Sequence, residues 1–317
     1  MPDSPHLLIP WATAQAEGCQ QALNTLSLPQ LDRLLARLAP AGGEAGDEHD
    51  YAPPHERALA RALGLPAHAT PWAAWEAADS AQPCAWITPC HWKAGADQFH
   101  MLPPEALALA EAESRALLAL LAPWFAEDGI TLHYQQPLRW LARGRAFENL
   151  ETAALDRVQG RDVRHWMPRG PHERLLQRLH SEVQMLLYTH AFNDARTARG
   201  QLPVNAIWVH GAGALAQPPA PSAAPQVDQT LRDAALRMDW AAWAAAWQAL
   251  DSGPVAQLAA QAERGMAVQL TLCGERAFLQ WHGTPRSMRQ KIQSLFRPQR
   301  RSEEHTSELQ SHLMISY

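Results

Sequence analysis

Residue types that bind ligands are concentrated between residues 182 and 213, where an apolar helical pattern passes into a short strand and a glycine turn. A strand is expected over 205–210, and the turn after it contains Gly211 and Gly213, which let the backbone approach a ligand or a helix closely. The candidate ligand-binding residues are Glu182, Gln184, His190, Asn193, Asp194, Arg196, Asn205, His210, Gly211, Gly213 and, after a separate strand, His91. No complete catalytic motif accompanies them, so the residues alone predict a polar site without a reaction.

The helix that precedes this segment leaves two interpretations open. Apolar residues at 175, 176, 179, 183, 186 and 187 form one stripe at the helical period. If the helix continued past Tyr188, His190 and Asn193 would join this buried stripe, where each unpaired polar group costs roughly 1–3 kcal/mol. Either the helix breaks near Thr189 or these side chains form a satisfied network, and a structural network is as well supported as a ligand site.

Two other groups of residues could bind a metal or act as a nucleophile, but each has a simpler interpretation. Asp47, Glu48, His49 and Asp50 are adjacent in a glycine-rich stretch, which favours a solvated turn because neighbours on a loop cannot converge on an ion without a scaffold. The Cys90–His91 pair has no partner at a regular spacing, so core packing is favoured. The sequence therefore predicts no metal site.

The composition is that of a globular chain and shows no charge excess typical of proteins that bind nucleic acid or membranes. The 317 residues carry a formal net charge of −5, which gives no basis for binding nucleic acid or a membrane surface. The four cysteines form no C-x-x-C pair, and no apolar run approaches the roughly 20 residues of a membrane helix. No secretory signal pattern is found at the start, so we expect a cytoplasmic protein.

The order of strand and helix patterns predicts an α/β fold. A buried strand over 6–10 is followed by helices over 14–26 and 31–38, the second capped by Ser27, and then by a loop over 42–51. A long helix is expected over 105–123 and a hairpin over 130–142, and Trp240, Trp243 and Trp247 should face the core from one late helix. Further strands are expected over 84–88, 99–102, 267–273 and 277–281, and further helices over 53–63, 72–75, 171–188, 255–263 and 286–297.

Five motifs in order resemble a bacterial family whose members are described as RpfE-type regulatory proteins or cofactor-independent phosphoglycerate mutase-like proteins. The motifs are P-P-H-E-R-A-L (53–59), W-I-T-P-C-H-W (86–92), E-D-G-I (127–130), R-W-L-A (139–142) and E-V-Q-M-L-L-Y-T-H-A-F-N-D-A-R (182–196). The resemblance implies an alkaline-phosphatase-like α/β core sheet flanked by helices, with a small α+β insertion. We expect the core in two parts, 1–128 and 171–300, and the insertion over 129–170. Residues 301–317 resemble translated adapter sequence and are expected to lie outside the fold.

The departures from the pattern of that superfamily shape the functional hypotheses. The resemblance implies an Asp-Gly metal ligand after the first strand, but Pro10-Trp-Ala-Thr13 stands there, and no Asp-His cluster follows residues 205–210. We therefore expect a regulatory or ligand-sensing protein that binds a small phosphorylated metabolite and needs no cofactor. The first alternative is an active Mn²⁺- or Mg²⁺-dependent mutase or phosphatase. Its rearranged ligands would be Asp47, His49, His91, Asp194 and His210. The second alternative is an interaction module with a Trp-rich surface and an unknown protein partner.

Overall fold

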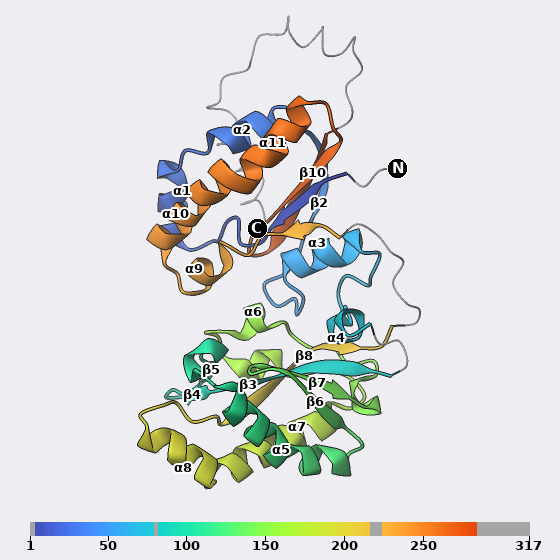
Figure 1. The fold of residues 1–317 in the computed structure, drawn as a ribbon, viewed down its shortest axis with the longest axis vertical. Helices are drawn as coiled ribbons and strands as arrows, with labels where there is room; N and C mark the ends of the chain where they lie inside the picture. The colour runs from blue at the N-terminus through green and yellow to red at the C-terminus, as the bar shows by residue number, and fades with distance from the viewer. Residues whose placement is uncertain (1–3, 79–81, 216–223, 284–317) are drawn as a thin grey trace, which may run out of the picture. The chain divides into compact units, whose positions relative to one another are not determined.

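The computed structural model describes residues 4–78, 82–215 and 224–283, which fall into two compact units. The first unit takes its described residues from Met1–Glu48, Pro54–Leu63 and Ser222–Tyr317, and the second from His49–Pro53 and Gly64–Pro221. Figure 1 shows strands and helices interleaved in both units. The α/β class expected from the sequence is confirmed, with helices flanking the sheet of each unit.

The first unit is built on a five-stranded sheet with the strand order β2-β11-β10-β1-β9. Strand β1 is parallel to β10 and β9, and β11 is antiparallel to β10 and β2. The strands are β1 (His6–Ile9), β2 (Ala39–Ala45), β9 (Gln226–Val227), β10 (Val268–Cys273) and β11 (Ala277–Gly283). The helices are α1 (Glu17–Thr25), α2 (Pro29–Leu35), α3 (Pro54–Ala62), α9 (Arg232–Leu236), α10 (Trp240–Leu250) and α11 (Ala256–Glu263), with a π-helical turn over Asp251–Val255.

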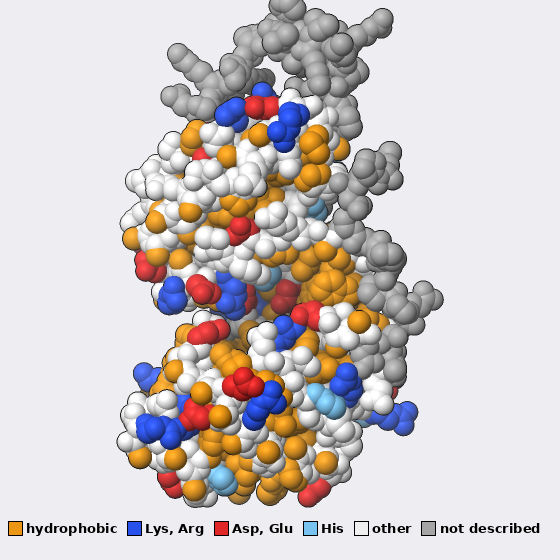
Figure 2. Space-filling view, viewed as in Figure 1, with side chains coloured by type: hydrophobic (Ala, Val, Ile, Leu, Met, Phe, Trp, Pro, Cys, Tyr) orange, Lys and Arg blue, Asp and Glu red, His pale blue; other side chains and the backbone are white. Residues whose placement is uncertain are grey.

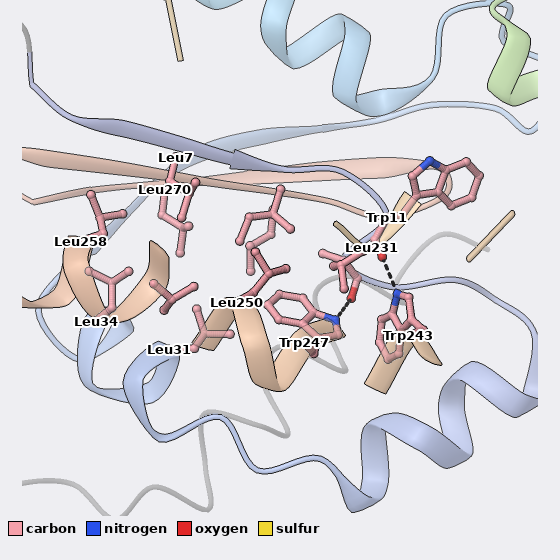
Figure 3. Packing of buried hydrophobic residues seen from close by; sticks show 14 of the residues in the cluster. Leu7, Trp11, Leu31, Leu34, Leu231, Trp243, Trp247, Leu250, Leu258 and Leu270 are labelled. Atoms are coloured by element: carbon pink, nitrogen blue, oxygen red, sulfur yellow. Dashed lines mark hydrogen bonds between the residues drawn. The ribbon is translucent and has the colours of Figure 1, made fainter. Parts of the chain in front are cut away.

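Alternation along β1 sends its side chains into two separate cores. Leu7 and Ile9 belong to the large cluster formed with α1, α2, α10 and α11, whereas Leu8 belongs to a smaller cluster with residues of α3. Trp243 and Trp247 of α10 are buried in the large cluster, which confirms that the tryptophan stripe faces the core. Their indole nitrogens donate to the backbone carbonyls of Trp11 and Ala12 at 2.9 and 3.3 Å, which fixes the turn after β1 (Figure 3).

The second unit contains a four-stranded antiparallel sheet with the order β6-β7-β3-β8 and a separate hairpin of β4 and β5. The strands are β3 (Cys84–Cys90), β4 (Trp92–Ala94), β5 (Phe99–Met101), β6 (Thr131–Gln136), β7 (Arg139–Arg143) and β8 (Ala206–Gly213). The helices are α4 (Trp72–Glu76), α5 (Glu111–Glu127), α6 (Leu155–Val158), α7 (Glu173–Tyr188) and α8 (Ala191–Ala198), with 3-10 turns at Pro104–Leu107, Arg145–Phe147 and Val163–Trp166.

Helices α5 and α7 cover one face of this sheet. Ile87, Val209 and Trp140 lie in register on neighbouring strands and join the apolar stripes of both helices in one core. The outer face of the two helices carries exposed apolar side chains, among them Trp124, Met185 and Tyr188, and hydrophobic colour is spread over this part of the second unit in Figure 2. No helix among the described residues is both long and apolar enough to cross a membrane.

Three local expectations were wrong. A loop was expected from residue 42, but residues 39–45 form the edge strand β2. The strand forms because Gly43 lets β2 approach β11 closely: a Cβ at this position would lie 2.5 Å from the Phe278 carbonyl oxygen. The cap of α2 is not Ser27, since the buried Asp251 carboxylate accepts from the Leu31 amide at 2.8 Å.

The expected long helix over 105–123 is in fact two elements. A 3-10 turn ends at Leu107 and is followed by Ala108, which has φ 45°; α5 then runs four residues beyond Pro123. The expected hairpin over 130–142 is present, and its strand β7 pairs with β3 within the sheet of the second unit. The expected helix over 286–297 and the tail 301–317 lie outside the described residues.

Candidate functional site

The polar segment after α7 begins with a helix break, as one of the two sequence interpretations required. Helix α7 ends at Tyr188, and His190 becomes the N-cap of α8. The His190 Nδ1 atom accepts a hydrogen bond from the Phe192 amide at 3.1 Å. This side chain therefore satisfies a free amide of the new helix, which is the ordinary role of an N-cap.

Asn193 and Arg196 bind the backbone around α8. The Asn193 amide donates to the carbonyls of Leu187 and Val204 at 2.8 and 2.7 Å, and its Oδ1 accepts from the Val204 amide at 2.9 Å. Arg196, which is fully buried, donates to the carbonyls of Leu202 and Leu107 and pairs with Glu113 at 2.9 Å. The structure brings these two residues together as a satisfied network that joins α8 to the start of β8.

The other candidates near this network lie on the surface or join strands. Asp194 is exposed, Gln184 is half-buried, and Glu182 lies 3.7 Å from Arg178. Asn205 binds both the amide and the carbonyl of Trp92, at 2.7 and 2.9 Å, and His91 Nδ1 lies 2.8 Å from the carbonyl oxygen of Pro203. The contacts of Asn205 and His91 hold the connection between β3, β4 and β8 in place.

His210 lies in a different environment, on the face of the sheet opposite α5 and α7. It is in register with Trp86 of β3, which is in register with Leu141 of β7, so the three share one face. Thr88 lies two residues along β3, and its Oγ1 is 3.1 Å from His210 Nε2. The glycines that follow allow this packing, since Gly211 has φ 59° and a Cβ there would lie 3.0 Å from Trp72 Cβ.

The electrostatics of this face keep His210 neutral. Burial, with a smaller contribution from Arg139, lowers the pKa of His210 to about 3, while Asp156 acts in the opposite direction. A histidine with this pKa is a weak base at neutral pH and a poor general acid–base catalyst. It can still donate one ring N–H or accept one hydrogen bond.

Arg139 completes the face as a stacked cation. Its guanidinium carbon lies 3.7 Å from the centre of the Trp86 ring, and one terminal nitrogen pairs with Glu76 at the end of α4. Two buried donors in this stack, Trp86 Nε1 and Arg139 Nε, have no hydrogen-bond acceptor among the described residues. We call Trp86, Thr88, Arg139 and His210 the donor face.

An acceptor is what the donor face lacks. A buried N–H group without an acceptor costs about 1–3 kcal/mol, so two such groups on one stacked pair of side chains favour occupation by an oxygen atom of a ligand or of water. The N–H groups of a positively charged guanidinium and of a neighbouring indole suit an anionic oxygen best. The arrangement can bind a carboxylate or phosphate group, and it offers no activated nucleophile.

The expected site residues are thus divided by the structure. His210 with its two glycines lies at the donor face, whereas Asn193, Arg196, Asn205 and His91 make structural contacts elsewhere in the second unit. Sequence reasoning missed Trp86, Thr88, Arg139 and Glu76 as site residues. The alternation of Trp86 and Thr88 along a strand was a usable signal for a shared face, but nothing local in the sequence links Arg139 to either.

Metal ligands do not converge in the described part of the chain. No group of three or more His, Cys, Asp or Glu side chains there is placed to hold an ion. His91 follows the end of β3, whereas His210 lies within β8 opposite Trp86, so about five residues or roughly 16 Å separate them along the strands. Thr13, which follows β1 in the first unit, is buried at 6% exposure.

Comparison with known proteins gives distant similarities to solved structures. No family model matches the chain, and no curated protein matches it significantly. Among solved structures, a cofactor-independent phosphoglycerate mutase from Thermoplasma acidophilum aligns with 98% of this chain and 100% of its own, at 12% identity and a TM-score of 0.38. The PH0037 protein from Pyrococcus horikoshii aligns with 90% of this chain and 88% of its own, at 10% identity and a TM-score of 0.43. Neither similarity is strong enough to carry an argument about function or about individual residues.

Proposed function

We propose that the chain is a phosphoglycerate mutase-like protein without phosphotransfer activity, which binds a small phosphorylated or carboxylated metabolite in a regulatory or sensing role. The observation that carries the proposal is the pair of buried donors, Trp86 Nε1 and Arg139 Nε, that lack an acceptor in the described residues. His210 and Thr88 beside them add two further groups that can hydrogen-bond to an anion.

The chemistry of the donor face supports binding over catalysis. Phosphoryl transfer needs charge neutralisation at the reacting group and an activated nucleophile. The donor face supplies a cation and neutral donors, while the low pKa of His210 makes it a weak base. A protein with these groups can recognise a charged metabolite and respond to its concentration.

Calorimetric titration with 3-phosphoglycerate, with inorganic phosphate and with neutral glycerol tests the proposal. We expect binding of the anions and none of glycerol. The Trp86→Phe variant removes one N–H and keeps the stacking ring, and loss of a hydrogen bond to a charged group should weaken binding about tenfold or more. Trp124→Phe, at an exposed position on α5, is the matched control and should bind as the wild type does.

Two results would overturn this function. Absence of binding for every anionic probe at millimolar concentration would remove the ligand-binding claim. Interconversion of 3- and 2-phosphoglycerate by the purified chain with added Mn²⁺ or Mg²⁺ would instead show an active enzyme.

A further inference from the structure

The ion pair between Glu76 and Arg139 occupies part of the donor face and satisfies only part of the guanidinium. The contact joins one terminal nitrogen of Arg139 to Glu76 Oε2, although carboxylates commonly bind a guanidinium through two parallel hydrogen bonds. The Arg139 Nε atom is buried and has no acceptor among the described residues. Glu76 therefore satisfies one part of the guanidinium and leaves another part open.

The two partners differ in how firmly they are held. Arg139 is fixed by stacking on Trp86, with its guanidinium carbon 3.7 Å from the ring centre. Glu76 is the last residue of the short helix α4, and 37% of its side chain is exposed to solvent. An ion pair with this exposure contributes little to stability, so Glu76 can turn away into water at small cost while Arg139 stays in place.

We propose that Glu76 is a built-in competitor for the anionic ligand: its carboxylate holds Arg139 when the donor face is empty, and a ligand phosphate or carboxylate displaces it. This inference rests on the proposed function and specifies what the ligand displaces at the same site. A ligand group with several anionic oxygens offers more than one acceptor to the unsatisfied donors Arg139 Nε and Trp86 Nε1, whereas Glu76 makes a single contact. The competition lowers the apparent affinity of every anion by the same factor, so only anions that bind the donor face tightly displace Glu76 at low concentration.

Calorimetric titration of the full chain with inorganic phosphate and with 3-phosphoglycerate tests this role. The Glu76→Gln variant keeps the size of the side chain and removes the competing charge, so both probes should bind about three- to fivefold more tightly. Acetate should gain by a similar factor, because an attached competitor lowers the apparent affinity of every anion equally. Glu105→Gln, at an exposed position of the same unit, should leave all affinities unchanged.

A double-variant cycle ties the effect to Arg139. Arg139→Lys keeps the positive charge but loses the Nε donor and the planar stack, so it should weaken phosphate binding, and Glu76→Gln should then give a smaller gain than in the wild type. The competitor role would be overturned, and the proposed function left intact, if Glu76→Gln bound no more tightly than the wild type while Trp86→Phe bound more weakly. Failure of both the wild type and Glu76→Gln to bind any anion would overturn both proposals together.

Discussion

Replacing Asn193 by alanine distinguishes a structural network from a ligand site in the segment between α7 and β8. The change removes three hydrogen bonds, of 2.7 to 2.9 Å, and leaves the carbonyls of Leu187 and Val204 and the Val204 amide without these partners. Leu187 and Val204 are both fully buried, so solvent does not replace the lost bonds. At about 1 kcal/mol for each bond, we expect the free energy of unfolding to fall by about 3 kcal/mol.

Urea unfolding followed by circular dichroism measures this loss. The midpoint should fall while the slope of the free energy against urea stays constant, because the surface exposed on unfolding is the same. Asn193→Asp should be similarly destabilised, since a carboxylate cannot donate to two carbonyls. Asp194→Ala, at the exposed neighbouring position, should change the stability by less than about 0.5 kcal/mol.

A small loss of stability for Asn193→Ala would contradict this prediction. A loss below about 1 kcal/mol for Asn193→Ala, together with weaker binding of 3-phosphoglycerate, would show that the side chain serves a ligand and that the network is dispensable. That result would contradict the structural role assigned to this segment.

The remaining predictions concern pH, glycine and an indole. The folded pKa of His210 is about 3, below its ordinary value of about 6.5, so the neutral ring favours folding at neutral pH and this stability is lost as pH falls below about 6.5. Between pH 7 and 5, the free energy of unfolding measured in urea should fall by about 2 kcal/mol more for the wild type than for His210→Gln. Equal losses would contradict the burial of the ring. Gly211→Ala should lower the melting temperature more than Gly200→Ala. Both glycines have positive φ, but only at Gly211 would a Cβ contact a neighbour, Trp72, at 3.0 Å. Equal shifts in calorimetry would show that this contact does not matter. Trp243→Phe should cost about 1 kcal/mol or more in urea through loss of its 2.9 Å bond to the turn after β1, and a neutral result would show that this bond does not hold the turn.

Much of the fold could be predicted because periodicity reports burial. The stripe of α7, the tryptophan stripe of α10 and the alternating hairpin of β6 and β7 all repeat at the period of their element, so single stretches of sequence determined them. Elements held by distant contacts were missed. Strand β2 is rich in glycine and proline and depends on β11 for its pairing, and the cap of α2 comes from Asp251.

The candidate site was predicted only in part for the same reason. Residue types in 182–213 showed that polar groups are concentrated there, but not where each side chain points. Asn193 and Arg196 donate to backbone carbonyls, whereas His210, within β8, contacts Thr88 and lies in register with Trp86. The contact of Arg139 with Trp86 and Glu76 joins three separate elements, and no local pattern in the sequence encodes such a contact.

The parallel pairing of β1 with β10 has a consequence for the order in which the chain folds during synthesis. His6 and Thr271 are 265 positions apart, yet their side chains bond at 2.8 Å across adjacent strands. The first strand leaves the ribosome early but cannot complete its sheet until β10 and β11 have been made, whereas the sheet of the second unit uses residues that are all available before residue 222. N-terminal segments usually fold first during translation, but here the second unit is expected to be complete while β1 still waits for its partner.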